Sequence, residues 1–329
     1  MNRKTIYISI AASLATAAAL VSLSPQTEAA GQADDAVEEA LATGEFSTVI
    51  SPVVPASMDF AGKQISFDRT DMYEKLDREL TSMTYTHGNT MLMIKRANRF
   101  FPILAPILKK NGIPLDMLYL AAIESNLSIR AYSPAKAAGL WQFMPSTAKQ
   151  FGLEVNEYVD ERYHIEKSTQ AACRYLKQAM TKYGNWESVA ASYNGGMARI
   201  SSEMDKQLVD NALDLYLVEE TTRYPFRIMA AKLIMENPVK YGFRLSADQL
   251  YQPIQCKEVI VNSPVEDWPT WAADHGITFA QLREVNPWIR ATSLPNKTGK
   301  TYQVKVPEKS SLYRSKQKTT VYNPNWIVR

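Results

Sequence analysis

The fold is decided by the stretch Ala122-Ile123-Glu124-Ser125, which closes an apolar run that starts behind Pro114. Pro114 suits the first position of a helix. The apolar positions Leu115, Leu118, Ala122 and Leu127 follow at helical spacing, and Glu124 lies beside that face. A carboxyl group held against apolar neighbours keeps its proton more easily, because desolvation disfavours the charged form. The stretch therefore predicts a helix that ends in a proton donor.

Two later segments carry further polar groups at fixed spacing. They are Gly139-Leu-Trp-Gln-Phe-Met-Pro145 and Ser192-Tyr-Asn-Gly-Gly196. Together with the Glu-Ser pair they resemble the catalytic domain of the lytic transglycosylases, a family that cleaves bacterial peptidoglycan. The resemblance runs from about Asp71 to Phe243, and a weaker likeness continues to about Pro307. Any one of the segments alone is a weak signal, since Tyr-Asn-Gly is common turn chemistry.

The resemblance implies a mainly α fold, with a lysozyme-like (goose-type) helical catalytic domain. It also implies that one glutamate, Glu124, acts twice on the β-1,4 bond between N-acetylmuramic acid (MurNAc) and N-acetylglucosamine (GlcNAc). The acid first protonates the linking oxygen. It then removes the proton from the muramic C6 hydroxyl, which attacks C1 and forms a 1,6-anhydro ring. An intramolecular nucleophile benefits from proximity.

The same resemblance assigns a set of substrate-binding residues around Glu124. They are Ser133, Gln142, Met144, Tyr193, Asn194, Thr221 and Tyr224. The amide of Gln142 can both donate to and accept from an acetamido group. Met144 is open between a sugar contact and a core position, whereas Trp141 is expected in the core. Gly195 and Gly196 are expected to let the glycan approach the backbone.

Glycoside cleavage usually needs two carboxylates, and Asp160 and Glu161 are the other candidates. If they were catalytic, the protein would be a lysozyme-type hydrolase on the same fold. We favour a helix-start and salt-bridge cluster with Arg162. A third alternative is a cell-wall-binding scaffold without activity.

Helical periodicity covers residues 70–245, where no alternating strand pattern is found. Met72, Leu76, Leu80 and Met83 share one face. Prolines and caps predict the remaining boundaries. Pro102 is predicted to end one helix and start another that stops at Asn111. A Ser168 cap is predicted to start a helix that ends at Gly184, and another helix is predicted to start near Pro225 and end at Met235.

The pattern changes after Pro253. Residues 258–261 and 302–306 read as strands, and residues 271–275 and 279–285 as helices. This order resembles a small α+β LysM module, which binds glycans. The usual Gly-Asp-Thr turn is replaced by Ser263-Pro-Val-Glu-Asp267, so glycan binding and simple buttressing of the catalytic domain remain alternatives. The tail after Glu308 is expected to be loosely ordered, although Tyr322, Trp326 and Ile327 can dock.

The amino-terminal segment reads as a secretory signal peptide over residues 1–29, with a basic start and an apolar run from Ile6 to Leu23. An uncleaved anchor is the alternative, and no cysteine stands near the cleavage site for a lipid anchor. We therefore expect an exported protein of the periplasm or cell envelope. The expected divisions are a flexible segment over residues 30–65, a helical lytic transglycosylase domain over 66–248, a LysM-like module over 254–308 and a tail over 309–329.

Composition and charge limit the classes of partner that the protein can bind. The net charge is +3 over 329 residues, and Lys and Arg are scattered, so no nucleic-acid surface is indicated. The expected partners are peptidoglycan glycan strands, and we expect a monomer without a cofactor. His87, His164 and His275 are isolated, which predicts no metal site. Cys173 and Cys256 are equally consistent with a disulfide and with two free thiols.

Overall fold

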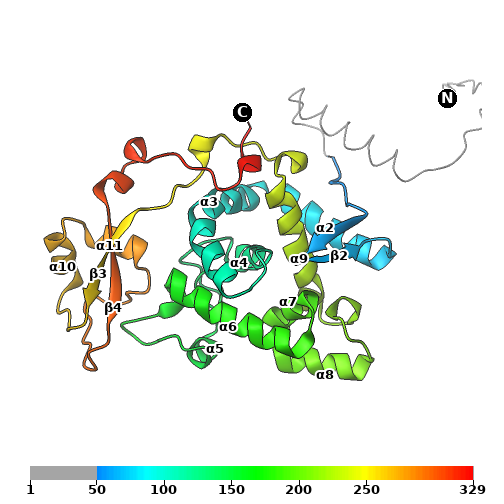
Figure 1. Cartoon of the computed structure of the whole chain (residues 1–329), viewed down its shortest axis with the longest axis horizontal. Coiled ribbons are helices and arrows are strands. Elements are labelled where there is room, and N and C mark those ends of the chain that lie inside the picture. Colours follow the sequence, from blue (N-terminus) through cyan, green and yellow to red (C-terminus); the bar gives the residue numbers. More distant parts are fainter. Residues whose placement is uncertain (1–49, 329) are drawn as a thin grey trace, which may run out of the picture.

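The computed structural model describes residues 50–328, so the predicted signal peptide lies outside the described residues. Figure 1 shows one group of helices with a smaller module of strands and helices beside it. The helices of the larger group are α2 (Thr70–Tyr85), α3 (His87–Lys110), α4 (Met117–Ser125), α5 (Pro145–Gln150), α6 (Ile165–Tyr183), α7 (Trp186–Gly195), α8 (Met197–Gln207) and α9 (Glu219–Glu236). Short 3-10 turns lie at Glu161–Tyr163, Ala212–Asp214, Val239–Tyr241, Ala247–Gln249, Lys309–Leu312, Arg314–Lys316 and Pro324–Trp326.

A β-hairpin precedes the helices. Strands β1 (Ser57–Phe60) and β2 (Lys63–Ser66) pair antiparallel across a two-residue turn. The hairpin packs Met58, Phe60 and Ile65 into the main hydrophobic core. The expectation of a flexible segment up to residue 65 is therefore wrong from Ser57 onward, because three apolar side chains gain a buried environment there.

The apolar face predicted on α2 is confirmed for Met72, Leu76 and Leu80, which are all buried. Three predicted boundaries are wrong. Pro102 lies inside the single helix α3, α6 begins at Ile165 rather than at a Ser168 cap, and α9 begins six residues before Pro225.

Packing explains why these boundaries moved. A proline removes one backbone hydrogen bond, but Phe101 and Leu104 on either side of Pro102 are buried in the core, which holds the helix together. Ser168 is buried, and its hydroxyl donates back to the carbonyl oxygen of Ile165, 3.2 Å away. Leu115, predicted on the buried face, is 44% exposed because α4 starts only at Met117.

The carboxyl-terminal module has the predicted order of strand, two helices and strand. Strands β3 (Cys256–Val261) and β4 (Tyr302–Pro307) pair antiparallel, with α10 (Trp268–Asp274) and α11 (Phe279–Val285) between them in sequence. Asp267 caps α10 and Thr278 caps α11, each by accepting a backbone N–H. The α+β expectation for this region is confirmed.

The segments that flank the module are fastened to one buried residue of α3. The Asn98 side-chain amide donates to the carbonyl oxygens of Tyr251 (3.2 Å) and Thr320 (3.0 Å), and its Oδ1 accepts from the backbone of Tyr322 at 2.8 Å. Gln252 reinforces the junction by accepting from the backbone of Thr320 at 2.8 Å. The segments that enter and leave the module are therefore held side by side.

The tail was expected to be loosely ordered, with docking of Trp326 as an option, and in the structure Trp326 does dock. Its indole is buried against Phe101 of α3, with ring centroids 5.9 Å apart, and its N–H donates to the carbonyl oxygen of Met235. In Figure 1 the red carboxyl-terminal segment returns to the helical domain near α3. Cys173 and Cys256 are both free thiols, which decides between the two alternatives of the sequence. Within residues 50–328, no helix is long and apolar enough to cross a bilayer.

Candidate active site

Glu124 occupies the last turn of α4. The helix before it is almost entirely buried, including Leu120, Ala121 and Ala122, because α3 and α9 pack around it. The helix ends at Asn126, whose left-handed backbone (φ 51°) turns the chain sharply away. The carboxyl group is thus carried at the edge of an apolar core, as the sequence predicted.

Burial raises the pKa of Glu124 from its ordinary value of 4.5 to about 7. The phenol of Tyr224 on α9 donates a hydrogen bond to the carboxylate and opposes that rise. The positive charge of Arg227 opposes it too, and the negative charge of Glu220 adds to it. Since Glu220, Tyr224 and Arg227 are spaced by four and three residues, they share one face of α9. The group is therefore poised to hold and release a proton near neutral pH.

Tyr193 lies close to Glu124 but does not hold its carboxyl group. Its hydroxyl donates to the carbonyl oxygen of Trp141 at 2.8 Å. The ring packs against Phe143 and Tyr175, with centroids 6.2 and 5.0 Å away. Burial and the neighbouring Glu124 hold the pKa of Tyr193 well above its ordinary value. The hydrogen bond to the Glu124 carboxylate thus comes from Tyr224 and not from Tyr193.

Ser133, Gln142 and Met144 lie on one loop, residues 131–144, which we call the Gln142 loop. The Ser133 hydroxyl accepts from the backbone of Ala137 at 3.0 Å, so it shapes the loop. The Gln142 amide donates to the carbonyl oxygen of Gly139 at 2.8 Å, and its backbone has a positive φ of 46°. Met144 is 41% exposed, which excludes a core position. Trp141 is fully buried, as expected.

Gly139 is required by a close backbone approach. A Cβ atom there would lie 1.9 Å from the carbonyl oxygen of Arg162, and the residue has φ 78°. Arg162 is itself buried, and its guanidinium donates to the carbonyl oxygens of Lys136 (2.7 Å) and Phe143 (3.0 Å). The Gln142 loop is therefore held against the turn at Glu161–Tyr163.

Asn194 and Thr221 bond to each other. The Thr221 hydroxyl donates to Oδ1 of Asn194 at 2.9 Å and so joins α7 to α9. A Cβ at Gly195 would meet Thr221 Cγ2 at 2.9 Å. Gly195 thus permits close packing of α7 against Thr221 of α9.

The alternative carboxylates are structural, as favoured from the sequence. Asp160 forms a buried bidentate pair with Arg162, with contacts of 2.9 and 2.7 Å. Glu161 pairs with Lys167 and accepts from the backbone of Glu154 at 2.8 Å. Both are therefore committed to partners that hold this turn.

One part of the site was not predicted. Glu79 of α2 is buried and pairs with Arg223 and with Arg227 of α9, and Arg227 also pairs with Glu220 at 2.9 Å. This chain of ion pairs places a fixed positive charge near Glu124. The spacing of Glu220, Tyr224 and Arg227 was the available signal, but the partner from α2 is more than 140 residues away in sequence.

Among the residues that the structure describes, no group of three or more His, Cys, Asp or Glu side chains is placed to hold a metal ion. The titratable groups around Glu124 are instead phenols, arginines and carboxylates in hydrogen bonds or ion pairs. The arrangement can supply one proton donor and acceptor with a near-neutral pKa.

Parts of the chain match two known protein domains. Residues 103–210 match the transglycosylase SLT domain, and residues 257–310 match the soluble lytic transglycosylase C-terminal LysM-like domain. The chain is similar to membrane-bound lytic murein transglycosylase D of Escherichia coli K12, with 29% identity over 241 residues, 72% of this chain and 51% of that protein. It thus spans about half the length of this curated relative.

Two solved structures are also similar. The 70 kDa soluble lytic transglycosylase Slt70 of Escherichia coli covers 64% of this chain and 42% of its own, with 17% identity and a TM-score of 0.38. An inactive variant of the lytic transglycosylase Slt of Pseudomonas aeruginosa covers 42% of this chain and 24% of its own, with 19% identity and a TM-score of 0.33.

Proposed function

Since the chain carries an SLT transglycosylase domain and a LysM-like carboxyl-terminal domain, we propose that it is an exported peptidoglycan lytic transglycosylase. The bond cleaved is the β-1,4 link from MurNAc to GlcNAc, and the product is a 1,6-anhydro-MurNAc end. The proposed working divisions are those of the sequence, with the helical domain over residues 66–248 and the module over 254–308. The partners are glycan strands of the periplasm or cell envelope.

One observation carries the proposal. Burial raises the pKa of Glu124 to about 7, whereas the other candidate carboxylates Asp160 and Glu161, and Glu220 on α9, are all held in ion pairs. An inverting or retaining hydrolase needs a second carboxylate to activate water or to attack C1. A single acid suffices when the nucleophile belongs to the substrate.

The chemistry follows from that single group. Protonated Glu124 donates its proton to the glycosidic oxygen, and the C1–O4 bond breaks with that electron pair leaving on GlcNAc. The resulting carboxylate then takes the proton of the muramic C6 hydroxyl, and the oxygen of that hydroxyl bonds to C1. Glu124 regains its proton, so the cycle balances without water. Tyr224 donates to the carboxylate form and keeps it oriented between the two steps.

The remaining polar residues act as substrate contacts or as scaffolding. Met144 is exposed at the rim of the Gln142 loop and contacts the sugar rings. The Gln142 Oε1 is the acceptor for an acetamido N–H, because its amide nitrogen is used within the loop. The Asn194–Thr221 pair and Ser133 fix the walls to which the glycan binds.

Mass spectrometry of the muropeptides released from purified peptidoglycan tests the proposal. The wild type is compared with Glu124→Gln and with Glu203→Gln, a partly exposed glutamate on α8 whose partners are Lys206 and Gln207. We expect products one water lighter than reducing muropeptides from the wild type and from Glu203→Gln, and none from Glu124→Gln.

Other outcomes overturn the proposal in distinguishable ways. Reducing ends would move the protein to the hydrolases and return attention to Asp160. Absence of products from a folded wild type that still sediments with peptidoglycan would favour a binding scaffold. Undiminished release by Glu124→Gln would remove Glu124 from the mechanism.

A further inference from the structure

The carboxyl-terminal module shares a buried core with the helical domain. Ala138 of the Gln142 loop and Val159 and Tyr163 of the following turn pack in the same cluster as Trp288 and Ile289 of the module. All five are buried, with no more than 4% exposed. A module that merely hung beside the catalytic domain would not bury these residues together.

Backbone bonds reinforce this contact. Val159 and Ile289 form an antiparallel bridge. Asp160 N–H donates to the carbonyl oxygen of Trp288 at 2.9 Å, and Arg290 N–H donates to that of Tyr158 at 2.9 Å. We call residues 158–164 the docking segment. Its backbone is therefore paired to the module as one strand pairs to another.

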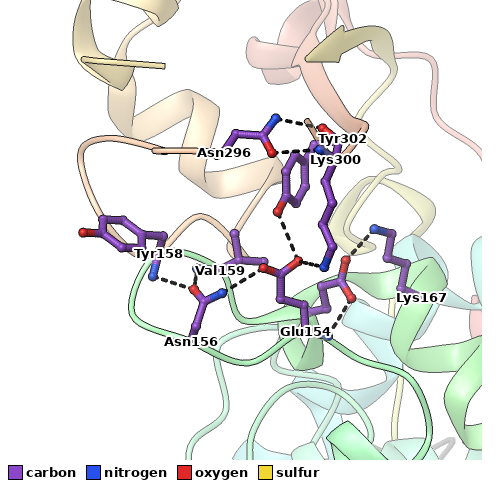
Figure 2. Close-up of polar contacts among 9 residues, drawn as sticks. Glu154, Asn156, Tyr158, Val159, Lys167, Asn296, Lys300 and Tyr302 are labelled. Carbon is purple, nitrogen blue, oxygen red and sulfur yellow. Dashed lines mark hydrogen bonds and ion pairs between the residues drawn. The ribbon is translucent and has the colours of Figure 1, made fainter. Parts of the chain in front are cut away.

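Side chains close the rim of the contact. Figure 2 shows the Glu154 carboxylate between Lys300 and Tyr302 of the module, at 2.9 and 3.1 Å. Lys167, drawn in the same view, pairs with the carboxylate of Glu161. The indole of Trp288 stacks between His164 and Tyr302, with centroids 6.0 and 5.6 Å apart. Polar and aromatic contacts thus fix the module in one orientation.

The docking segment in turn holds the Gln142 loop. Arg162 donates from Nε and Nη2 to Asp160, and from Nη1 to the carbonyl oxygens of Lys136 and Phe143. Gly139 packs so closely on the Arg162 backbone that an added Cβ would lie 1.9 Å from its carbonyl oxygen, so the loop and the docking segment are in direct contact. One rigid path therefore runs from the module through Arg162 to the loop that carries Gln142 and Trp141.

We propose that the module is a positioning element of the active site, with Arg162 as the positioning residue that passes its support to the Gln142 loop. The proposal rests on the proposed function and deepens it, because it gives the LysM-like module a catalytic task in place of independent glycan binding. Loss of the contact leaves Glu124 in place on α4 while the loop that orients the sugar becomes mobile.

Hydrogen–deuterium exchange of the full chain tests the mechanical part without any substrate. Trp288→Leu removes the stacked indole, and Trp271→Leu is the matched control. Trp271 belongs to the same module but packs on Trp268 and His275. We expect amides of residues 131–144 to exchange at least tenfold faster in Trp288→Leu, and those of Leu120 to Glu124 to keep their wild-type rates.

Equal protection of the loop in both variants would overturn the proposal, as would a matching loss throughout α4. If Trp288→Leu does not fold, Tyr302→Phe with Lys300→Met weakens only the rim shown in Figure 2 and keeps the test available. The exchange result stands even where the proposed function fails, since it requires no turnover.

Kinetics then test the catalytic part. Trp288→Leu and Arg162→Lys are expected to lower kcat about tenfold with KM changed less than twofold, because loop geometry matters in the transition state. Trp271→Leu is expected to keep both constants. A rise in KM with unchanged kcat would instead make the module a substrate binder and refute the positioning role.

Discussion

Glu124→Gln is expected to stabilise the protein in a pH-dependent way. Burial raises the pKa of Glu124 from 4.5 to about 7, so the folded chain disfavours the carboxylate. A glutamine is neutral at every pH, has the same shape and still accepts the hydrogen bond from Tyr224. The variant therefore removes the cost of burying a charge and little else.

The sign and size follow from proton linkage. Between pH 4.5 and 7 the folded state keeps a proton that the unfolded state has lost, so wild-type stability falls as pH rises through this window. Below pH 4.5 both states hold the proton, and above pH 7 neither does. At about 1.36 kcal/mol per pH unit, the loss over these 2.5 units is at most about 3.4 kcal/mol. Partial exposure of Glu124 makes this an upper bound.

Thermal and urea unfolding at pH 4.5 and pH 8.5 measure the effect. We expect Glu124→Gln to match the wild type at pH 4.5 and to exceed its Tm by roughly 5 °C at pH 8.5. Glu203→Gln, which changes a partly exposed carboxylate on α8, controls for the loss of one negative charge. A difference that is equal at the two pH values would refute the reasoning, because it would show that Glu124 is not desolvated.

Three further changes have defined outcomes. Tyr224→Phe removes the hydroxyl bond that favours the carboxylate, so the pKa of Glu124 rises further and the alkaline limb of the kcat/KM profile moves to higher pH. Movement of that limb to lower pH would contradict this role. Gly139→Ala places Cβ 1.9 Å from a backbone carbonyl oxygen, and we expect it to cost at least about 3 kcal/mol in urea unfolding, whereas Gly112→Ala, which has a similar φ but open space, should cost only about 1 kcal/mol. Trp326→Ala should lower the unfolding free energy by about 3 kcal/mol, and an unchanged midpoint would mean that the tail does not contribute.

Much of the fold could be predicted from hydrophobic periodicity and capping residues. The face of Met72, Leu76 and Leu80, the stop at Asn111 and the helix Phe279–Val285 could be predicted because local propensity and burial point the same way there. Pro102 could not be placed correctly by the same rules. A local breaker is overridden when the residues around it are buried by neighbours distant in sequence.

The active site also has features that could be predicted from the sequence and features that could not. Glu124 was identifiable from its apolar helix and the motifs downstream, but the sequence did not say which of Tyr193 and Tyr224 reaches its carboxyl group. That choice depends on how α7 and α9 cross α4, which no periodicity specifies. The ion pair from Glu79 to Arg227 was invisible for the same reason, since it joins two helices that only tertiary packing brings together.

Asn98 affects how fast the module can rebind the docking segment after the two separate. Because that side chain binds the segments on both sides, the module is a closed loop whose ends are held at one point. Its rebinding to the docking segment is therefore intramolecular, at an effective concentration set by a short tether rather than by a long free linker. A brief opening would be followed by rapid return to the same face, so a modest interface is enough to keep the contact almost permanently formed.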